Sequence, residues 1–200
     1  MKILFIHPPW ADVYAGYKDA AKLGVQYPPL GICYLAAIAK RLGHICKIID
    51  AEPAGYTYDD IVRIAEEFEP DIIGITSTTP IFNQAVATAK ALKEKLNVPI
   101  LIGGSHISVV PEDTFRYANT FDIGVIGEGE KTFVELLEYF EGKRKINEIK
   151  GIIYKEQDKI IMTEPRPMLR PEELDELPLP ERKLLDLEKY TWSVPKKGIV

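Results

Sequence analysis

The chain of 200 residues is long enough for one domain of about 150 residues and a smaller appendage. Its composition, 46% hydrophobic and 28% charged, is that of an ordinary soluble globular protein, and a formal net charge of −5 argues against a nucleic-acid-binding surface. No apolar run approaches the ~20 residues of a membrane span, and the first apolar run is too short for a signal peptide. Two cysteines, Cys33 and Cys46, offer neither a disulfide framework nor a metal-ligand spacing, so we expect a reducing, cytoplasmic location.

The first fifty residues predict a strand, a long loop, a helix and a second strand. Residues 2–6 form an apolar run that ends at His7-Pro8-Pro9-Trp10, and residues 11–27 show no clear period, so we expect a long loop there. Residues 30–42 predict a helix, and residues 45–49 a strand. The residues expected on the buried face of that helix are Leu30, Tyr34, Ile38 and Leu42.

From residue 57 the chain continues to alternate helix and strand. Thr57 is the expected N-cap of a helix that ends near Phe68, because carboxylates in the first turn suit the helix dipole. A strand over residues 71–75 follows, and its exit is the polar run Thr76-Ser77-Thr78-Thr79. A helix over residues 81–96 completes this unit.

The apolar run over residues 99–102 is short enough to be a strand buried on both faces. It breaks at Gly103-Gly104, where no side chain prevents another group from lying against the backbone. Ser105 and His106 then add hydrogen-bonding groups. Taken alone, such a glycine pair marks either a tight turn or the floor of a ligand site.

The last third of the chain changes character. A short helix after Pro111 and a strand over residues 122–126 lead through Gly127-Glu128-Gly129 into a helix that ends near Gly142. Beyond it, two short runs predict a β-hairpin, and a stretch rich in Pro and Glu predicts a stiff, extended linker. The hairpin strands and the linker cover residues 151–155, 159–163 and 164–180. We therefore divide the chain into residues 1–145 and residues 146–200.

Five β-α units with short apolar strands predict an α/β fold, a doubly wound parallel sheet with helices on both faces. The flavodoxin-like (Rossmann-like) strand order 2-1-3-4-5 is favoured, and in that fold ligands bind outside the carboxyl ends of the strands. The polar and glycine-rich segments all follow strands: His7, Asp50, residues 76–79, residues 103–106 and residues 127–130. That convergence favours a ligand site over a plain turn at Gly103-Gly104.

Three common ligands of this fold are disfavoured by particular residues. Flavin mononucleotide needs a phosphate-cradling loop after the first strand, where Pro8 and Pro9 lack backbone N–H groups. A phospho-receiver needs an Asp where Thr76-Ser77 stands. A dinucleotide fingerprint lacks its third glycine after Gly127, and Glu128 and Glu130 would repel phosphate at the helix start.

Several motifs, in this order, resemble one family. Asp50-x-x-x-x-Gly55, Ser77 and Gly103-Gly104 are similar to the pattern of cobalamin-binding domains, and other segments resemble the variant at the N-terminus of class B radical SAM enzymes, the magnesium-protoporphyrin ester cyclase-like and methyltransferase group. These other segments are His7-Pro8-Pro9, residues 28–36 (Pro28-Pro29-Leu30-Gly31 to Ala36), Gly103-Gly104-Ser105-His106 with Pro111-Glu112, Gly127-Glu128-Gly129-Glu130 with Thr132-Phe133, and residues 177–182 (Leu177-Pro178-Leu179-Pro180-Glu181-Arg182).

The resemblance implies a cobalamin site at the carboxyl edge of the sheet. The nucleotide tail of the cofactor would lie in a slot floored by Gly103-Gly104, with Ser77 or a neighbouring Thr hydrogen-bonding it. Where related domains carry the His that coordinates cobalt from below, this chain has Glu52, so the resemblance implies base-off cobalamin without a His ligand. It implies no catalytic or metal-ligating residue in this chain. The cofactor-binding residues it implies are His7, Pro8, Asp50, Glu52, Gly55, Thr76, Ser77, Thr78, Gly103, Gly104, Ser105, His106, Gly127, Glu128 and Gly129.

The resemblance further implies that catalysis belongs to a radical SAM barrel of the same protein, with a 4Fe–4S cluster and S-adenosylmethionine, performing methyl transfer or a related radical reaction. The Cys-x-x-x-Cys-x-x-Cys motif of such a barrel is not among these 200 residues, so we expect no turnover by this chain alone. Two alternatives remain open: a stand-alone cobalamin carrier or sensor domain, and a flavodoxin-like nucleotide-binding domain.

Overall fold

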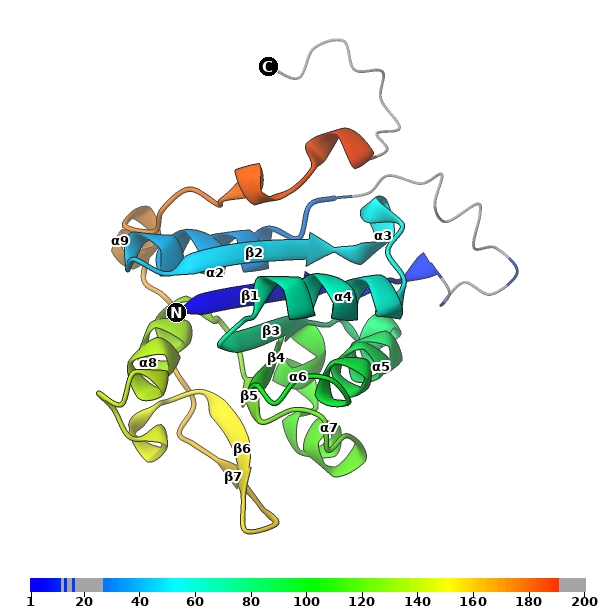
Figure 1. The fold of residues 1–200 in the computed structure, drawn as a ribbon. Coiled ribbons are helices and arrows are strands. Elements are labelled where there is room, and N and C mark those ends of the chain that lie inside the picture. The colour runs from blue at the N-terminus through cyan, green and yellow to red at the C-terminus, as the bar shows by residue number, and fades with distance from the viewer. Residues whose placement is uncertain (12, 14–15, 17–26, 191–200) are drawn as a thin grey trace.

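The computed structural model describes residues 1–11, 13, 16 and 27–190, and their strands form one seven-stranded sheet in the order β2-β1-β3-β4-β5-β6-β7 (Figure 1). The first five strands run parallel, and the last two form an antiparallel hairpin that pairs with β5. The bounds are β1 Lys2–His7, β2 Ile45–Asp50, β3 Ile72–Thr76, β4 Ile100–Gly103, β5 Ile123–Val125, β6 Ile152–Glu156 and β7 Lys159–Met162.

The predicted parallel sheet and its strand order 2-1-3-4-5 are confirmed, and the hairpin lies where it was expected. The expectation of five strands was too low, because β6 adds to the edge of β5 instead of forming a separate ribbon. The apolar residues of β6, Ile152 and Ile153, are fully buried as a result.

Helices cover both faces of the sheet. Helices α2 and α8 share one hydrophobic core with it, and α4, α5 and α7 share the other, as their places in Figure 1 show. The bounds are α2 Leu30–Arg41, α3 Ala51–Ala54, α4 Tyr58–Phe68, α5 Phe82–Lys93, α6 Ser105–Val109, α7 Pro111–Tyr117, α8 Glu130–Phe140 and α9 Pro171–Asp175. The predicted cap of α4 is confirmed: Thr57 and Asp60 form a reciprocal capping box.

The expected buried face of α2 is confirmed only in part, because Ile38 is buried but the residues at the two ends of that face are not. Leu30 and Leu42 are 45% and 49% exposed. The helix instead packs its small residues on the sheet; these are Cys33, Ala36 and Ala39, with Ile32 beside them. Small side chains let the helix lie close to the strands, and a search for large apolar residues at helical spacing overlooks such a face.

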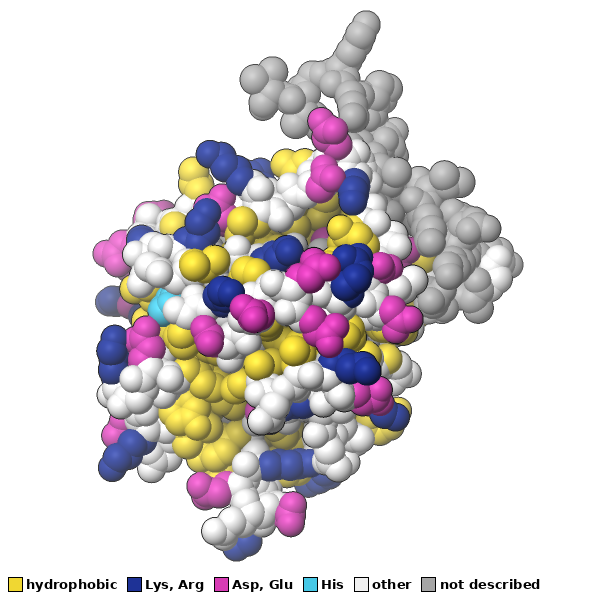
Figure 2. Space-filling view, in the orientation of Figure 1, with side chains coloured by type: hydrophobic (Ala, Val, Ile, Leu, Met, Phe, Trp, Pro, Cys, Tyr) yellow, Lys and Arg dark blue, Asp and Glu magenta, His cyan; other side chains and the backbone are white. Residues whose placement is uncertain are grey.

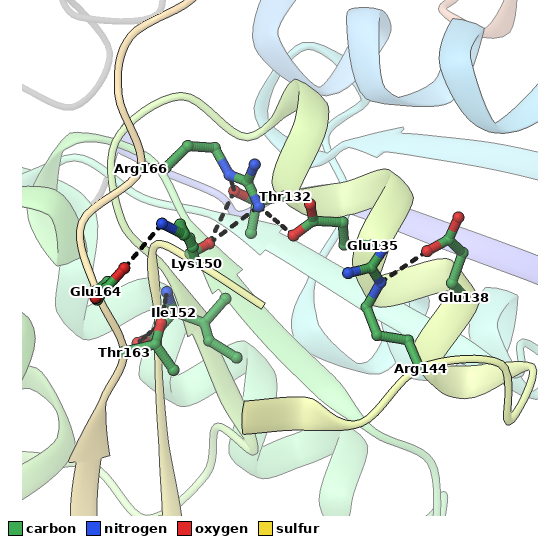
Figure 3. Close-up of polar contacts among 9 residues, drawn as sticks. All are labelled: Thr132, Glu135, Glu138, Arg144, Lys150, Ile152, Thr163, Glu164 and Arg166. Atoms are coloured by element: carbon green, nitrogen blue, oxygen red, sulfur yellow. Dashed lines mark hydrogen bonds and ion pairs between the residues drawn. The ribbon is translucent and has the colours of Figure 1, made fainter. Parts of the chain in front are cut away.

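The segment after the hairpin is held against the domain along its length. Figure 3 shows Arg166 reaching across α8, where it donates to Thr132 and pairs with Glu135, while Thr163 exchanges hydrogen bonds with Ile152. Further along, the backbone of Leu169 donates to the carboxylate of Glu128 at 2.6 Å. The expected extended linker is therefore interrupted by the helical turn α9. It also contacts α8 and the loop before that helix.

The same segment then crosses α2 towards the carboxyl edge of the sheet. The backbone N–H of Glu181 donates to the carbonyl of Cys33 at 3.0 Å, and its carboxylate pairs with Lys40 at 2.8 Å. Two 3₁₀ turns follow, Arg182–Leu184 and Leu187–Lys189, and they lead to the buried side chain of Tyr190.

The surface carries charges of both signs. On the face shown in Figure 2, Lys and Arg side chains are interspersed with Asp and Glu, and hydrophobic side chains gather between α8 and the hairpin. Within the described ranges, no helix is long and apolar enough to cross a membrane. Most of the loop expected over residues 11–27 lies outside the described residues.

Candidate functional site

A cavity of about 230 Å³ opens at the carboxyl ends of β1, β3, β4 and β5, between the sheet and helices α2 and α8. Its walls are mostly apolar. The lining residues are Phe5, Gly31, Ile32, Leu35, Gly74, Ile75, Thr76, Leu101, Ile102, Gly103, Gly104, Val125, Gly127, Glu128, Gly129, Glu130 and Phe133. The strand register places Thr76 beside Gly103 at this edge. This is the position at which a doubly wound sheet binds its ligands.

The two glycines of the cavity floor have different structural roles. Gly104 has φ +100°, and a Cβ there would lie 2.5 Å from the carbonyl oxygen of Ser77. The backbone therefore passes so close to β3 that only glycine fits. A Cβ placed on Gly103 would have no other atom within 4 Å. Gly103 thus leaves room in the cavity without being required by the fold.

The polar exit of β3 divides between two hollows. Thr76 lines the cavity, whereas Thr78 lines a neighbouring hollow with His7, Trp10 and Ile81. Ser77 is buried and donates its hydroxyl hydrogen to the carbonyl of Thr78 at 2.9 Å. Of the hydroxyl groups expected to meet a ligand, the one on the cavity wall belongs to Thr76.

The loop between β5 and α8 supplies the other wall. Gly127 has φ +78°, and its N–H donates to the hydroxyl of Ser108 at 2.9 Å. Glu128 faces the segment after the hairpin, where its carboxylate accepts from Leu169. Glu130, the first residue of α8, also lines the cavity, and its Oε2 atom is buried without a hydrogen-bond partner among the described residues.

Asp50 is a buried carboxylate with two partners. Register pairs it with His7 at the ends of β2 and β1, and its Oδ1 lies 2.9 Å from Nδ1 of His7. Its Oδ2 accepts from the hydroxyl of Tyr190 at 2.6 Å. Burial, followed by this bond, raises the pKa of Tyr190 well above its ordinary value. Because the Nδ1 side of the His7 ring faces this carboxylate, its Nε2 is left for the hollow that His7 lines.

Glu52 caps the loop that follows β1. Its Oε2 accepts backbone N–H groups from Trp10 and Ala11, both at 2.7 Å. Gly55, with φ +68°, closes the short helix α3 behind it. The carboxylate at the position where related domains carry a histidine therefore points at the backbone of a neighbouring loop.

His106 lies in the short helix α6 and not in a loop. Its ring stacks on Phe82 with 3.9 Å between centroids, and its Nδ1 lies 3.2 Å from the hydroxyl of Thr79. Burial lowers its pKa. Ser105 beside it is exposed, and neither residue lines the cavity.

The structure thus brings six of the predicted site residues to one cavity and places the others around it. The six are Thr76, Gly103, Gly104, Gly127, Glu128 and Gly129. The residues placed elsewhere are His7, Pro8, Asp50, Glu52, Gly55, Ser77, Thr78, Ser105 and His106. The sequence analysis missed the contribution of α2, and of Glu130 and Phe133 on α8. A signal for α2 was present in Gly31, because glycine early in a helix leaves space beside the backbone.

A second hollow, of about 560 Å³, lies at the amino-terminal ends of β4 and β5, with Phe121, Tyr139 and Tyr154 in its walls. It is larger than the cavity at the carboxyl edge, but it lies at the edge opposite to that at which such sheets bind ligands. Within the described ranges, no three His, Cys, Asp or Glu side chains are grouped so that they could hold a metal ion.

Comparison with known proteins decides the family. A family model described as the B12 binding domain matches residues 18–137. The chain belongs to the B12-binding domain family. The resemblance to cobalamin-binding domains that the sequence motifs indicate is therefore confirmed.

Relatives of this B12-binding domain come from the groups that its motifs resemble. It is 38% identical to an uncharacterized methyltransferase of Pyrococcus horikoshii, over 100% of this chain and 42% of that protein. It is 27% identical to the anaerobic magnesium-protoporphyrin IX monomethyl ester cyclase of Cereibacter sphaeroides, over 85% of this chain and 28% of that protein. The chain spans less than half the length of the curated relatives it matches.

Solved structures agree on the fold. The cobalamin-dependent S-adenosylmethionine radical enzyme OxsB, with aqua-cobalamin and S-adenosylmethionine bound, superimposes with a TM-score of 0.70 at 19% identity. The match covers 90% of this chain and 24% of that one. The B12-binding domain described here therefore has the same arrangement of strands and helices as a domain within a much longer chain.

Proposed function

We propose that the chain binds cobalamin with the nucleotide tail of the cofactor in the cavity between the sheet, α2 and α8. The observation that carries this proposal is the cavity itself, which opens at the carboxyl edge of the sheet and has Gly103 and Gly104 as its floor. Membership of the B12-binding domain family indicates that the ligand is cobalamin, and the cavity can receive its nucleotide tail.

The residues present fit such a group. The cavity exceeds the ~150 Å³ of an engineered apolar cavity that takes up one benzene ring, so a flat aromatic base can enter it. Gly103 offers backbone that a side chain would otherwise cover. The buried oxygen of Glu130 without a partner is a polar atom for which a ligand can supply one.

We propose further that cobalamin is bound base-off, without a histidine below the cobalt. Glu52 supports this, because its carboxylate is already engaged by the N–H groups of Trp10 and Ala11. His106 is stacked on Phe82, and His44 lies 3.2 Å from the N-terminal amino group at the amino-terminal edge of the sheet. His7 is at the correct edge, but Asp50 holds its Nδ1.

In the whole protein, we propose, residues 1–145 act as the cofactor domain, and residues 146–200 extend it towards a radical SAM barrel with a 4Fe–4S cluster and S-adenosylmethionine. The reaction class is methyl transfer or a related radical reaction, for which bound cobalamin supplies a cobalt ion that can carry a methyl group. The names of the relatives, a methyltransferase and a cyclase, support this class. Cys33 and Cys46 are buried and unpaired, and burial raises the pKa of each to about 11, which suits unreactive thiols in the cytoplasm.

The test is a titration of the chain with hydroxocobalamin, followed by desalting. We expect the visible absorption of cobalamin to stay with the protein, and flavin mononucleotide, titrated in parallel, to be lost on desalting. A colourless protein fraction under oxidising and reducing conditions contradicts the proposed function. Retention of the flavin instead supports the nucleotide-binding alternative.

A further inference from the structure

Glu130 has an unusual environment for a carboxylate. It lines the cavity at the start of α8, and its Oε2 atom is buried with no hydrogen-bond partner among the described residues. Buried carboxylate oxygens are normally hydrogen-bonded, because an unsatisfied one loses its solvation without compensation. An oxygen of this kind in the wall of a ligand cavity indicates that the ligand supplies the donor.

Among the described residues of the cavity wall, no cationic side chain can pair with Glu130. Strands β1, β3, β4 and β5 contribute apolar residues, glycines and the hydroxyl of Thr76, and α2 contributes Gly31, Ile32 and Leu35. The loop before α8 adds Glu128, whose carboxylate accepts from Leu169, and α8 itself adds Phe133. The described lining contains no Lys, Arg or His, so it offers Glu130 no counter-charge.

We propose that Glu130 shares a proton with a ring nitrogen of the aromatic base at the end of the cofactor tail. This inference rests on the proposed function, and it goes further by assigning a role to one residue and a protonation state to the ligand. An ionised carboxylate that faces the lone pair of a ring nitrogen is repelled by it. With one proton between them, the N–H donates to the carboxylate in a charge-assisted hydrogen bond.

The proton balance is simple. In free cobalamin the ring nitrogen uses its electron pair to bind cobalt; in the base-off form this pair would be released and would take up one proton from the solvent. No group is oxidised or reduced. A protonated nitrogen has no electron pair left for the metal, so the contact with Glu130 favours the base-off form. Glu130 is a positioning residue in this role, since it acts on the tail and not on the cobalt.

The experiment is calorimetric titration of the chain in two buffers with different enthalpies of ionisation, at a pH where the free base carries no proton. The ligands are hydroxocobalamin and cobinamide, which lacks the tail base. We expect uptake of close to one proton per cobalamin bound and none with cobinamide. In Glu130→Gln the uptake disappears, because an amide has no negative charge to stabilise the protonated ring.

A second variant measures the strength of the contact. Glu130→Leu replaces the carboxylate by a shorter apolar group, and the affinity for cobalamin should fall about tenfold to a hundredfold, as for the loss of one hydrogen bond to a charged group. The affinity for cobinamide should not change, and this also shows that the variant is folded. Glu138→Gln, which removes a charge on the same helix at the pair with Arg144, is the matched control.

The outcomes separate the two proposals. If the unaltered chain binds neither ligand, the proposed function is wrong and the role of Glu130 falls with it. If cobalamin binds without proton uptake, or the uptake persists in Glu130→Gln, the assignment of Glu130 is wrong while the proposed binding of cobalamin stands. An equal loss of affinity for both ligands in Glu130→Leu also overturns it, because cobinamide has no base to contact.

Discussion

The hydroxyl of Tyr190 donates to Oδ2 of Asp50 at 2.6 Å, although 140 residues separate the two in the sequence. The other oxygen of Asp50 lies 2.9 Å from His7, so one buried carboxylate joins the last described residue to the ends of β1 and β2. The last described residue therefore lies at the carboxyl edge of the sheet, the edge at which the candidate cavity opens.

We expect Tyr190→Phe to lower the free energy of unfolding by about 1.5–3 kcal/mol, the range for a hydrogen bond to a charged group. Burial raises the pKa of Tyr190 in the folded protein, so the contribution of the hydroxyl is fully present below the ordinary tyrosine pKa of about 10 and is lost as the pH rises above it. Denaturant unfolding at several pH values measures both effects. Tyr117→Phe, at a ring that is 70% exposed, is the control and should change little. Equal stability of the two variants contradicts the prediction.

Glu52 gives a second test, since its two hydrogen bonds predict a structural role. Glu52→Ala leaves the N–H groups of Trp10 and Ala11 without their carboxylate, and we expect a loss of about 1–3 kcal/mol for each N–H that stays buried and unsatisfied. Glu52→Gln keeps an acceptor oxygen and should lose less. Thermal melting measures the order, and Glu67→Gln on the exposed face of α4 is the control. A melting temperature unchanged in Glu52→Ala would show that the carboxylate does not hold this loop.

Substitutions at the two glycines of the cavity floor should have different effects, one on cobalamin affinity and the other on the stability of the fold. Gly103→Val places a branched side chain in open space, so we expect weaker cobalamin binding with little change in stability. Gly104→Ala is strained by its φ of +100° and by the oxygen of Ser77 at 2.5 Å, so we expect it to lower stability by more than 1 kcal/mol, on the order of other strained positions. Cobalamin titration and circular dichroism melts of both variants give the two readouts. Unchanged affinity in a folded Gly103→Val would remove this glycine from the site.

The parallel sheet could be predicted from the sequence because short apolar strands, each followed by polar or glycine residues, have few other solutions. The cavity edge followed from the same rule, which correctly brought Thr76, Gly103 and Gly127 together. Side-chain direction could not be predicted in this way. Ser77 and His106 follow strands just as Thr76 does, yet one turns to its own loop and the other stacks on Phe82.

The contacts of the C-terminal segment could not be predicted from sequence patterns either. A stretch rich in Pro and Glu has the composition of a linker, and nothing local marks Leu169, Glu181 or Tyr190 as contact residues. Each of them meets a partner more than 40 residues away in the chain, and such pairings depend on where the fold places both ends. Composition predicts the stiffness of a segment, but its docking is a tertiary property.

The last prediction concerns the lower side of the cobalt in bound cobalamin. Of the three histidines, His106 is stacked on Phe82, His44 lies beside the N-terminal amino group, and His7 lines the hollow at the carboxyl edge of the sheet. Because Asp50 fixes the His7 ring through Nδ1, we expect the ring to stay in its own hollow. The electron paramagnetic resonance spectrum of the bound Co(II) form should then show no three-line splitting from an axial nitrogen.

Cobinamide distinguishes the two ways in which this prediction can fail. A three-line splitting with cobalamin but not with cobinamide would come from the tail base and would contradict base-off binding. A splitting with both ligands would come from the protein, and its loss in His7→Ala but not in His44→Ala would identify His7 as the ligand. His7, which the strand register places beside Asp50, would then supply the imidazole that related domains carry after Asp50. The ring would come from the neighbouring strand β1 and not from the loop after β2.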